Sequence, residues 1–226
     1  MRIRLVLAAV GTTAAAALVA VVPNLAHADD VHSTIIGGDT VASAPWSAQV
    51  LTNGRFTCSG TIIAPTWVLT ARHCIQPNMS VRVGDVRLGS GTTATVVRSA
   101  TRNDLALMNL AKPINTTFSK LASADPPVGA TNEIFGWGMT CFSGCQPSPQ
   151  LKTATVRVSG FTQDAFGGRA IASRRINGNA WKGDSGGPQY YNGLQVGVAS
   201  TADGRSIQNY GSVPFNRAWI RATAGV

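Results

Sequence analysis

The sequence predicts an all-β domain, built as a barrel or a sandwich, behind a removable N-terminal leader. Short apolar or alternating runs recur along the chain, and glycine or proline turns separate most of them. No long helical period occurs before residues 215–221, where we expect one short helix near the C-terminus. The chain has 226 residues, of which 44% are hydrophobic, so it can bury a substantial core and is not a disordered chain.

Residues 1–28 have the layout of a secretory signal peptide. A basic start at residues 1–4 is followed by an apolar run over 5–22 and by a small-residue cleavage site, Ala-His-Ala, at 26–28. We expect cleavage before Asp29 and a secreted, extracellular protein. The alternative is a membrane anchor, which the alanine-rich composition and the stop at Pro23 disfavour. No later segment is suited to span a bilayer, so we expect no membrane partner.

The strands are expected in two similar-sized halves of one domain, with a boundary near residues 120–130. After the leader the chain has no linker, no low-complexity block and no repeated module. The predicted strands are 46–51, 61–64, 67–70, 81–83, 93–97 and 105–110 in the first half, and 133–137, 151–158, 189–191 and 194–199 in the second.

The charge balance is basic, with a formal net charge of +9. Removing the first 34 residues leaves this charge unchanged, because two arginines and two aspartates leave together. Such a chain is suited to adhere to anionic polymers or cell walls. The cations are scattered, however, and Arg174-Arg175 is their only adjacent pair, so we expect no nucleic-acid partner.

The four cysteines are best explained as disulfides. An oxidising exterior favours disulfide bonds, and sequence proximity favours the pairs Cys58–Cys74 and Cys141–Cys145, although four cysteines allow three pairings. Closing the first loop would stabilise the fold by about 3 kcal/mol in the loop-entropy model. A zinc site is the rival interpretation, but His73 is the single histidine close to a cysteine and paired CxxC spacing is absent. We therefore expect no metal and no other cofactor.

His73 is the candidate general base. The other two histidines, His27 and His32, lie in or just after the leader. His73 follows a predicted strand and precedes Cys74, so a sheet end and a disulfide would both fix its backbone, as general-base catalysis requires. The alternative is a buried histidine with a purely structural role.

A carboxylate and a serine complete the candidate set. Asp104 stands at the start of an apolar run, where burial without a partner would be costly. The alternative is a loop carboxylate that faces water at the start of a strand. Ser185 lies in the stretch AWKGDSGGP, residues 180–188, whose three glycines and one proline indicate a backbone held close to another part of the protein.

Six ordered segments carry a resemblance to a known family. They are Ile35-Ile36-Gly37-Gly38, Cys58-Ser59-Gly60-Thr61, Thr70-Ala71-Arg72-His73-Cys74, Asp104-Leu105-Ala106-Leu107, Gly136-Trp137-Gly138 and Gly183-Asp184-Ser185-Gly186-Gly187-Pro188. In this order and at comparable spacings they resemble the landmarks of chymotrypsin/trypsin-like serine proteases. The resemblance covers the chain from residue 35 to its end, and the short leader and few disulfides are similar to secreted actinobacterial members.

The resemblance implies a fold and a set of roles. The fold would be two packed six-stranded antiparallel β-barrels, chymotrypsin-like, with a short C-terminal helix and the site in the cleft between them. His73 would be the general base, Asp104 would hold its tautomer and Ser185 would attack the scissile carbonyl. The N–H groups of Gly183 and Ser185 would form the oxyanion hole. Ser200 resembles the serine that hydrogen-bonds the aspartate of the triad.

The resemblance also implies an activation step. In the family, the carboxylate beside the nucleophile, here Asp184, pairs with the α-amino group freed at Ile35. Residues 29–34 would then be a short pro-segment that ends in Thr34, whereas trypsin-activated zymogens end in a basic residue. The alternative is that Gly37-Gly38 is only a turn before the first strand.

The positions that set substrate choice depart from the trypsin pattern. Asn179, six residues before Ser185, replaces the aspartate of a trypsin-type enzyme, so we do not expect strict cleavage after arginine or lysine. Ala202 replaces a usual glycine on the pocket wall and would narrow the pocket. Trp181 stands where a disulfide cysteine is common. Three charged residues are candidates for the rim of the pocket, and we interpret each as a solvated loop charge: Lys182, Asp203 and Arg205.

The resulting hypothesis is a secreted, monomeric serine endopeptidase that hydrolyses protein or peptide substrates through an acyl-enzyme. Two alternatives remain from other classes. One is a non-catalytic secreted binding protein on a protease scaffold, and the other is a secreted esterase or acyl transferase that uses the same acyl-enzyme chemistry.

Overall fold

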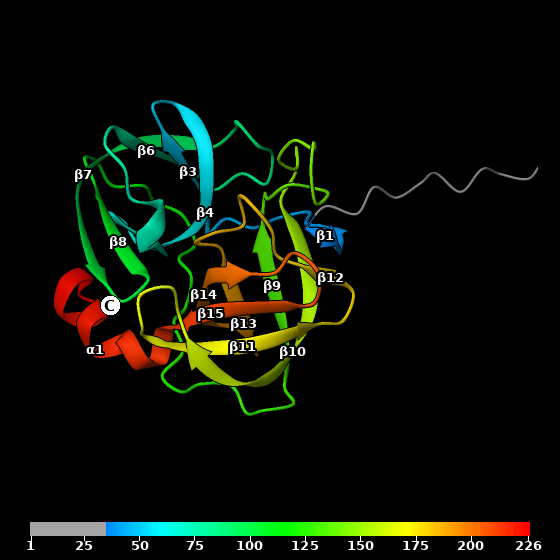
Figure 1. Cartoon of the computed structure of the whole chain (residues 1–226). Coiled ribbons are helices and arrows are strands. Elements are labelled where there is room, and N and C mark those ends of the chain that lie inside the picture. Colours follow the sequence, from blue (N-terminus) through cyan, green and yellow to red (C-terminus); the bar gives the residue numbers. More distant parts are fainter. Residues whose placement is uncertain (1–34) are drawn as a thin grey trace, which may run out of the picture. The chain divides into compact units, whose positions relative to one another are not determined.

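The structure, a computed structural model, describes residues 35–226. The predicted signal peptide, residues 1–28, and the predicted pro-segment, residues 29–34, lie outside these residues. Within them the fold consists of two closed antiparallel barrels and one helix, as the resemblance implied (Figure 1).

The first barrel closes from six strands in the order β3-β4-β5-β8-β7-β6, with β3 paired to β6. Their apolar residues fill one core that includes Val50, Ile62, Leu69 and Leu107, each fully buried. Burial of these β-branched and aliphatic side chains is the main favourable term for this half. The strands are β3 (Ser47–Thr52), β4 (Arg55–Ala64), β5 (Trp67–Ala71), β6 (Met79–Val83), β7 (Thr92–Arg102) and β8 (Leu105–Leu110).

The second barrel is a ring in the order β9-β10-β11-β15-β14-β13, which β13 closes by pairing with β9. The short strand β2 (Asp39–Thr40) adds to β10, and β1 (Ile36–Gly37) pairs separately with β12 (Gly178–Asn179). The ring strands are β9 (Thr131–Gly136), β10 (Lys152–Gln163), β11 (Arg169–Arg175), β13 (Pro188–Tyr191), β14 (Leu194–Ala202) and β15 (Ile207–Ser212).

Helix α1 (Val213–Ala224) connects the second barrel back to the first. Ser212 caps its start by accepting a hydrogen bond from Phe215 N at 3.1 Å, and Gly225, at φ 78°, ends it. Val213 and Ile220 pack into the core of the first barrel, and Figure 1 shows α1 beside β7 and β8. The helix is longer than the predicted 215–221 because the cap lies three residues before the apolar period begins.

Two long strands, β11 and β15, were not predicted. Their sequences, RAIASRR and IQNYGS, carry too many polar residues for a clear apolar alternation. Both strands form because each has a partner on both sides: β11 lies between β10 and β15, and β15 between β11 and β14. Tertiary pairing here overrides local propensity.

A buried polar junction joins the two barrels. Gln195 in β14 accepts hydrogen bonds through Oε1 from Thr61 Oγ1 in β4 at 2.9 Å and from Ser119 Oγ at 2.8 Å. The Ser119 hydroxyl also lies 2.6 Å from the hydroxyl of Tyr190 in β13. Because these groups are buried, each needs its partner inside the protein.

We predict that Gln195→Ala lowers the free energy of unfolding by about 3 kcal/mol, because it removes the acceptor of the buried Thr61 hydroxyl, breaks the bond from Ser119 and opens a small cavity. Urea denaturation followed by tryptophan fluorescence measures this change. Gln163→Ala, at the exposed end of β10, is the control and should shift the value by less than about 0.5 kcal/mol. Equal effects of the two variants would contradict the role of the junction.

Candidate functional site

His73 is held rigidly at the end of β5. It lies in a short 3₁₀ turn, η1 (Arg72–Cys74), which Ile75 N closes by donating to Arg72 O at 3.0 Å. Cys74 is bonded to Cys58 in β4, with 6.2 Å between the Cα atoms, so the structure contains the disulfide favoured from sequence. The His73 side chain stays 31% exposed, which leaves one edge of the ring accessible.

Asp104 faces His73 from the turn between β7 and β8 and has a fully buried side chain. Its Oδ1 and Oδ2 lie 3.0 and 2.9 Å from His73 Nδ1, and Oδ1 also accepts the His73 backbone N–H at 3.1 Å. An ionised carboxylate can only accept, so Nδ1 donates to it, and in a neutral imidazole Nε2 is then the free acceptor. The alternative of a carboxylate facing water does not describe this residue.

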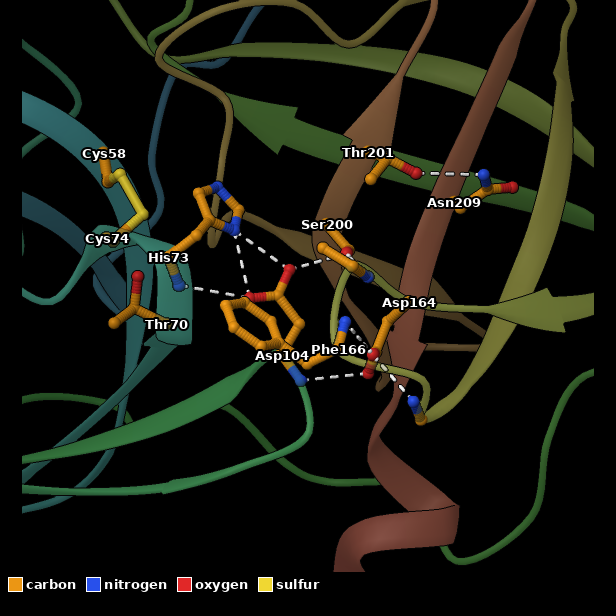
Figure 2. A network of polar contacts seen from close by, with 12 residues as sticks. Cys58, Thr70, His73, Cys74, Asp104, Asp164, Phe166, Ser200, Thr201 and Asn209 are labelled. Carbon is orange, nitrogen blue, oxygen red and sulfur yellow. Dashed lines mark hydrogen bonds and ion pairs between the residues drawn. A yellow bond between two sulfur atoms is a disulfide. The ribbon is translucent and has the colours of Figure 1, made fainter.

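Strand β14 and the turn at residues 164–168, both from the second barrel, hold Asp104 from the other side (Figure 2). Ser200 Oγ donates to Asp104 Oδ2 at 2.6 Å and accepts from Ala165 N at 3.0 Å. Since the Ala165 N–H occupies a lone pair of the hydroxyl, the hydroxyl proton is directed at Asp104. Ser200 therefore contacts the carboxylate as the resemblance implied.

Asp164 anchors that turn, although no sequence motif marks it as a residue of the site. The nearly buried carboxylate accepts from Phe166 N at 2.9 Å and Gly168 N at 2.8 Å, and its Oδ2 accepts from Asp104 N at 3.0 Å. Figure 2 shows Asp164 between the turn and Asp104. The sequence DAFGG at 164–168 indicates a turn, because aspartate accepts backbone N–H groups and glycine follows. Nothing local indicates that Asp104 is the other partner.

The loop that carries Ser185 packs against the same end of the first barrel. Ser59 N donates to Ser185 O at 2.9 Å, and Ser59 Oγ donates to Gly183 O at 3.0 Å. At Gly186, with φ 78°, a Cβ would overlap Thr70 and the backbone of Ser59 and Ala71. Only glycine permits this approach, which brings the serine loop to the strand end that leads into His73.

The backbone amides of Gly183 and Ser185 have no hydrogen-bond partner within residues 35–226, and neither has that of Lys182. The intervening amide of Asp184 donates instead to Trp181 O at 3.0 Å. Gly183 has φ 96°, a conformation that disfavours a side chain. The unpaired amides of Gly183 and of Ser185 itself can stabilise a negative oxygen bound beside this serine.

Asp184 is a second buried carboxylate beside the serine. Its Oδ1 accepts from Gly138 N at 2.7 Å and its Oδ2 from Trp181 N at 2.9 Å. No cation lies within ion-pair distance of it in the described part of the chain. Burial raises the pKa of Asp184 to about 7, against the lowering effect of the two backbone hydrogen bonds.

Ile35 is also fully buried, and it packs in one cluster with Ala180, Ala199 and Tyr210. These three partners line the pocket described next, so Ile35 supports the pocket from behind its surface. Its φ is 43°, which is an unusual and strained value for a β-branched residue.

A pocket of about 180 Å³ opens beside Ser185. Its surface is largely apolar, with Ala180, Ala199 and Tyr210 among the lining residues, and the predicted residues Ser200 and Ala202 line it as well. The Tyr210 hydroxyl is buried and has no hydrogen-bond partner within the described chain. Burial and the nearby Asp184 raise the pKa of Tyr210.

Asn179, predicted to bind substrate at the pocket floor, does not line the pocket. It is fully buried in β12, where it pairs with Ile36 of β1, and its Nδ2 donates to Ala180 O at 2.9 Å. The side chain is therefore turned into the local backbone, and the neighbouring Ala180 contributes to the wall. This position still lacks the negative charge of a trypsin-type aspartate.

Trp181 connects two loops at the pocket edge through non-covalent contacts. Its Nε1 donates to Phe142 O at 3.1 Å, and the two rings stack with centroids 4.8 Å apart and planes at 16°. A Cβ on Gly204 would overlap the indole, so the ring also lies against that loop. Phe142 belongs to the loop closed by the Cys141–Cys145 disulfide, the second pairing favoured from sequence.

Within residues 35–226, no group of three or more histidine, cysteine, aspartate or glutamate side chains is arranged to hold a metal ion. None of the helices described is long and apolar enough to cross a membrane.

Comparison with known proteins agrees with this geometry. The family model described as Trypsin matches residues 35–220. Trypsin delta of Drosophila erecta is 30% identical, with 82% of this chain and 87% of that protein covered, and trypsin alpha of Drosophila melanogaster is 30% identical, with 84% and 87% covered. The solved structure of neuropsin, a serine protease expressed in the limbic system of mouse brain, aligns with a TM-score of 0.73 at 26% identity, covering 83% of this chain and 98% of that one. Human heparin binding protein, at 24% identity and TM-score 0.73, covering 84% and 96%, shares the fold. The chain belongs to the Trypsin family and is a trypsin-like serine endopeptidase.

Proposed function

We propose that the chain is a secreted endopeptidase that cleaves peptide bonds through an acyl-enzyme on Ser185, with His73 and Asp104 as its partners. The observation that carries this proposal is the contact of both Asp104 oxygens with His73 Nδ1, which leaves Nε2 free to accept a proton. The serine loop packs against the strand that leads into His73, which supports the grouping of the three residues.

The proposed reaction has two steps. The Ser185 hydroxyl oxygen attacks the carbonyl carbon while His73 Nε2 takes its proton, and Asp104 stabilises the imidazolium. The amides of Gly183 and Ser185 donate to the oxygen that becomes negative. The carbon–nitrogen bond then breaks, His73 returns the proton to the leaving amine, and the acyl group remains on the serine. Water repeats the attack on this ester with His73 as base and releases the acid.

We further propose that the active form starts at Ile35, after removal of the predicted signal peptide and of residues 29–34. A free α-ammonium at Ile35 would supply the cation that the buried Asp184 lacks. Cleavage before Ile35 would also remove the strain at that residue, because φ exists only while a preceding carbonyl is attached. Because Ile35 is buried against residues of the pocket wall, cleavage before Ile35 would also order the pocket.

Ser185→Ala is predicted to keep the fold and to remove nearly all turnover, leaving at most about one part in 10⁴, because the amides and the pocket remain but the nucleophile does not. Hydrolysis of a peptide library and labelling with a fluorophosphonate measure this loss, with circular dichroism as the test of folding. Ser99→Ala, at an exposed position of β7, should behave as the wild type.

These measurements also separate the alternatives. A fluorophosphonate label on Ser185 without cleavage of any peptide would indicate an esterase or acyl transferase. No label on protein that starts at Ile35 would indicate a non-catalytic binding protein.

Asp164→Ala is predicted to lower kcat about tenfold to a hundredfold with little change in KM, because it releases Asp104 N and the turn that orients Ser200. Steady-state kinetics on one peptide measure both constants. Asp125→Asn is the matched control, since Asp125 pairs with Arg169 at the start of β11 and thus supports the same hairpin without touching Asp104. Equal losses in the two variants would reduce Asp164 to a general structural role.

The pH dependence of stability is predicted to differ between the unprocessed chain and the chain that starts at Ile35. Without a cation, the raised pKa of Asp184 lets the folded state keep a proton that the unfolded state loses above about pH 4. Stability of the unprocessed chain should therefore fall by roughly 2–4 kcal/mol between pH 4 and pH 7. An α-ammonium at Ile35 should offset most of this fall.

Urea denaturation at pH 5 and pH 7.5 measures both forms. Asp184→Asn in the unprocessed chain is the control and should flatten the slope with pH, because the amide does not titrate. The same slope in the variant would show that another group is responsible.

A further inference from the structure

We infer that a cationic rim beside the pocket recognises acidic side chains that flank the substrate residue bound in the pocket. The rim consists of Phe142, Trp181, Lys182 and Arg205. This inference rests on the proposed function, since it names the class of peptide that the same site prefers: one with glutamate or aspartate next to a neutral residue.

The two cations of the rim lie on a stacked pair of aromatic rings. Trp181 and Phe142 stack at 4.8 Å, Lys182 Nζ lies 5.8 Å from the Trp181 ring and Arg205 Cζ lies 5.5 Å from the Phe142 ring. These distances are within the range of cation–π attraction. Trp181 and Lys182 line the pocket together with Ser185, so the rim begins where substrate would bind.

Both cations keep their hydrogen-bonding capacity. Lys182 and Arg205 are exposed, and within residues 35–226 neither side chain donates a hydrogen bond or forms an ion pair. Asp203 is close in sequence, but its Oδ1 accepts the N–H groups of Arg205, Ser206 and Ile207 at 2.8, 2.8 and 2.9 Å. Lysine offers three donors and arginine five, all suited to a carboxylate.

The rim is held in place before any substrate arrives. The Trp181 Nε1 hydrogen bond, the contact with Gly204 and the Cys141–Cys145 disulfide fix both rings. A guanidinium that lies over a ring face still presents its N–H edge outward, where it can bind a carboxylate with two hydrogen bonds. Preorganised donors lose less conformational entropy on binding, so Lys182 and Arg205 should contribute more to the affinity for a carboxylate than free surface lysines do.

Charges inside the pocket do not oppose this preference. The pocket carboxylate, Asp184, is buried and both of its oxygens accept backbone N–H groups, so it does not present a free negative charge to substrate. The net charge of +9 adds attraction for acidic chains at longer range. We therefore assign Lys182 and Arg205 a role in binding in place of the interpretation as solvated loop charges. Asp203 instead accepts the backbone N–H groups of its own turn.

The test uses two blocked, fluorescein-labelled octapeptides that contain one central leucine and differ only in whether glutamate or glutamine flanks it. We expect the wild-type protein that starts at Ile35 to cleave the glutamate peptide with a kcat/KM about threefold to tenfold higher at low salt. Fluorescence anisotropy with the Ser185→Ala protein should show the same preference in Kd, and this measurement does not depend on turnover.

Lys182→Gln and Arg205→Gln should each reduce the preference, and the double variant should remove it. Lys112 is an exposed cation that follows β8 in the first barrel. Its variant Lys112→Gln removes the same charge as each single rim variant, so it is the control and should keep the full preference. Equal binding of the two peptides by the Ser185→Ala protein, or binding of neither, overturns the inference. A preference in Kd without cleavage would retain the rim and reject the proposed peptidase, so the two failures are distinguishable.

Discussion

The buried carboxylate of Asp104 is the constraint on which the arrangement of the site depends. A carboxylate with no exposed surface needs hydrogen-bond donors, and these come from chain segments far apart in sequence: the turn at His73 in the first barrel, and Ser200 in the second. The Ala165 N–H, from a hairpin of the second barrel, in turn orients the Ser200 hydroxyl. Asp104 is therefore satisfied only when the two barrels are docked in one way, so the cost of burying its charge enforces that docking.

The two buried carboxylates of the site are stabilised differently. Asp104 has an imidazole and a hydroxyl as side-chain partners, whereas Asp184 has two backbone amides and no cation. Burial therefore raises the pKa of Asp184 to about 7. In the proposed mechanism this difference separates their tasks, since Asp104 acts on His73 during each turnover and Asp184 acts once, when a new amino terminus arrives.

Aromatic contacts fix the edge of the pocket. Trp181 lies where the family resemblance suggests a cysteine, and it contacts Phe142 through an indole hydrogen bond and a ring stack, and lies against Gly204. An aromatic tie differs from a covalent one in that its faces attract cations. Lys182 and Arg205 lie over those faces, so the aromatic pair also holds positive charge at the entrance to the pocket.

The all-β class, most strands of both barrels and both disulfides were predictable from the sequence, and so was the proposed set of His73, Asp104 and Ser185, because these signals are local: apolar alternation, cysteine proximity and short motifs. The sequence did not predict β11 and β15, whose polar residues become strand only through partners on both sides. It placed Asn179 at the pocket floor, whereas that side chain donates to the Ala180 carbonyl and does not line the pocket. The contact of Asp164 with Asp104 and the position of the rim were decided only by tertiary structure, since each joins side chains from loops that meet after the barrels close.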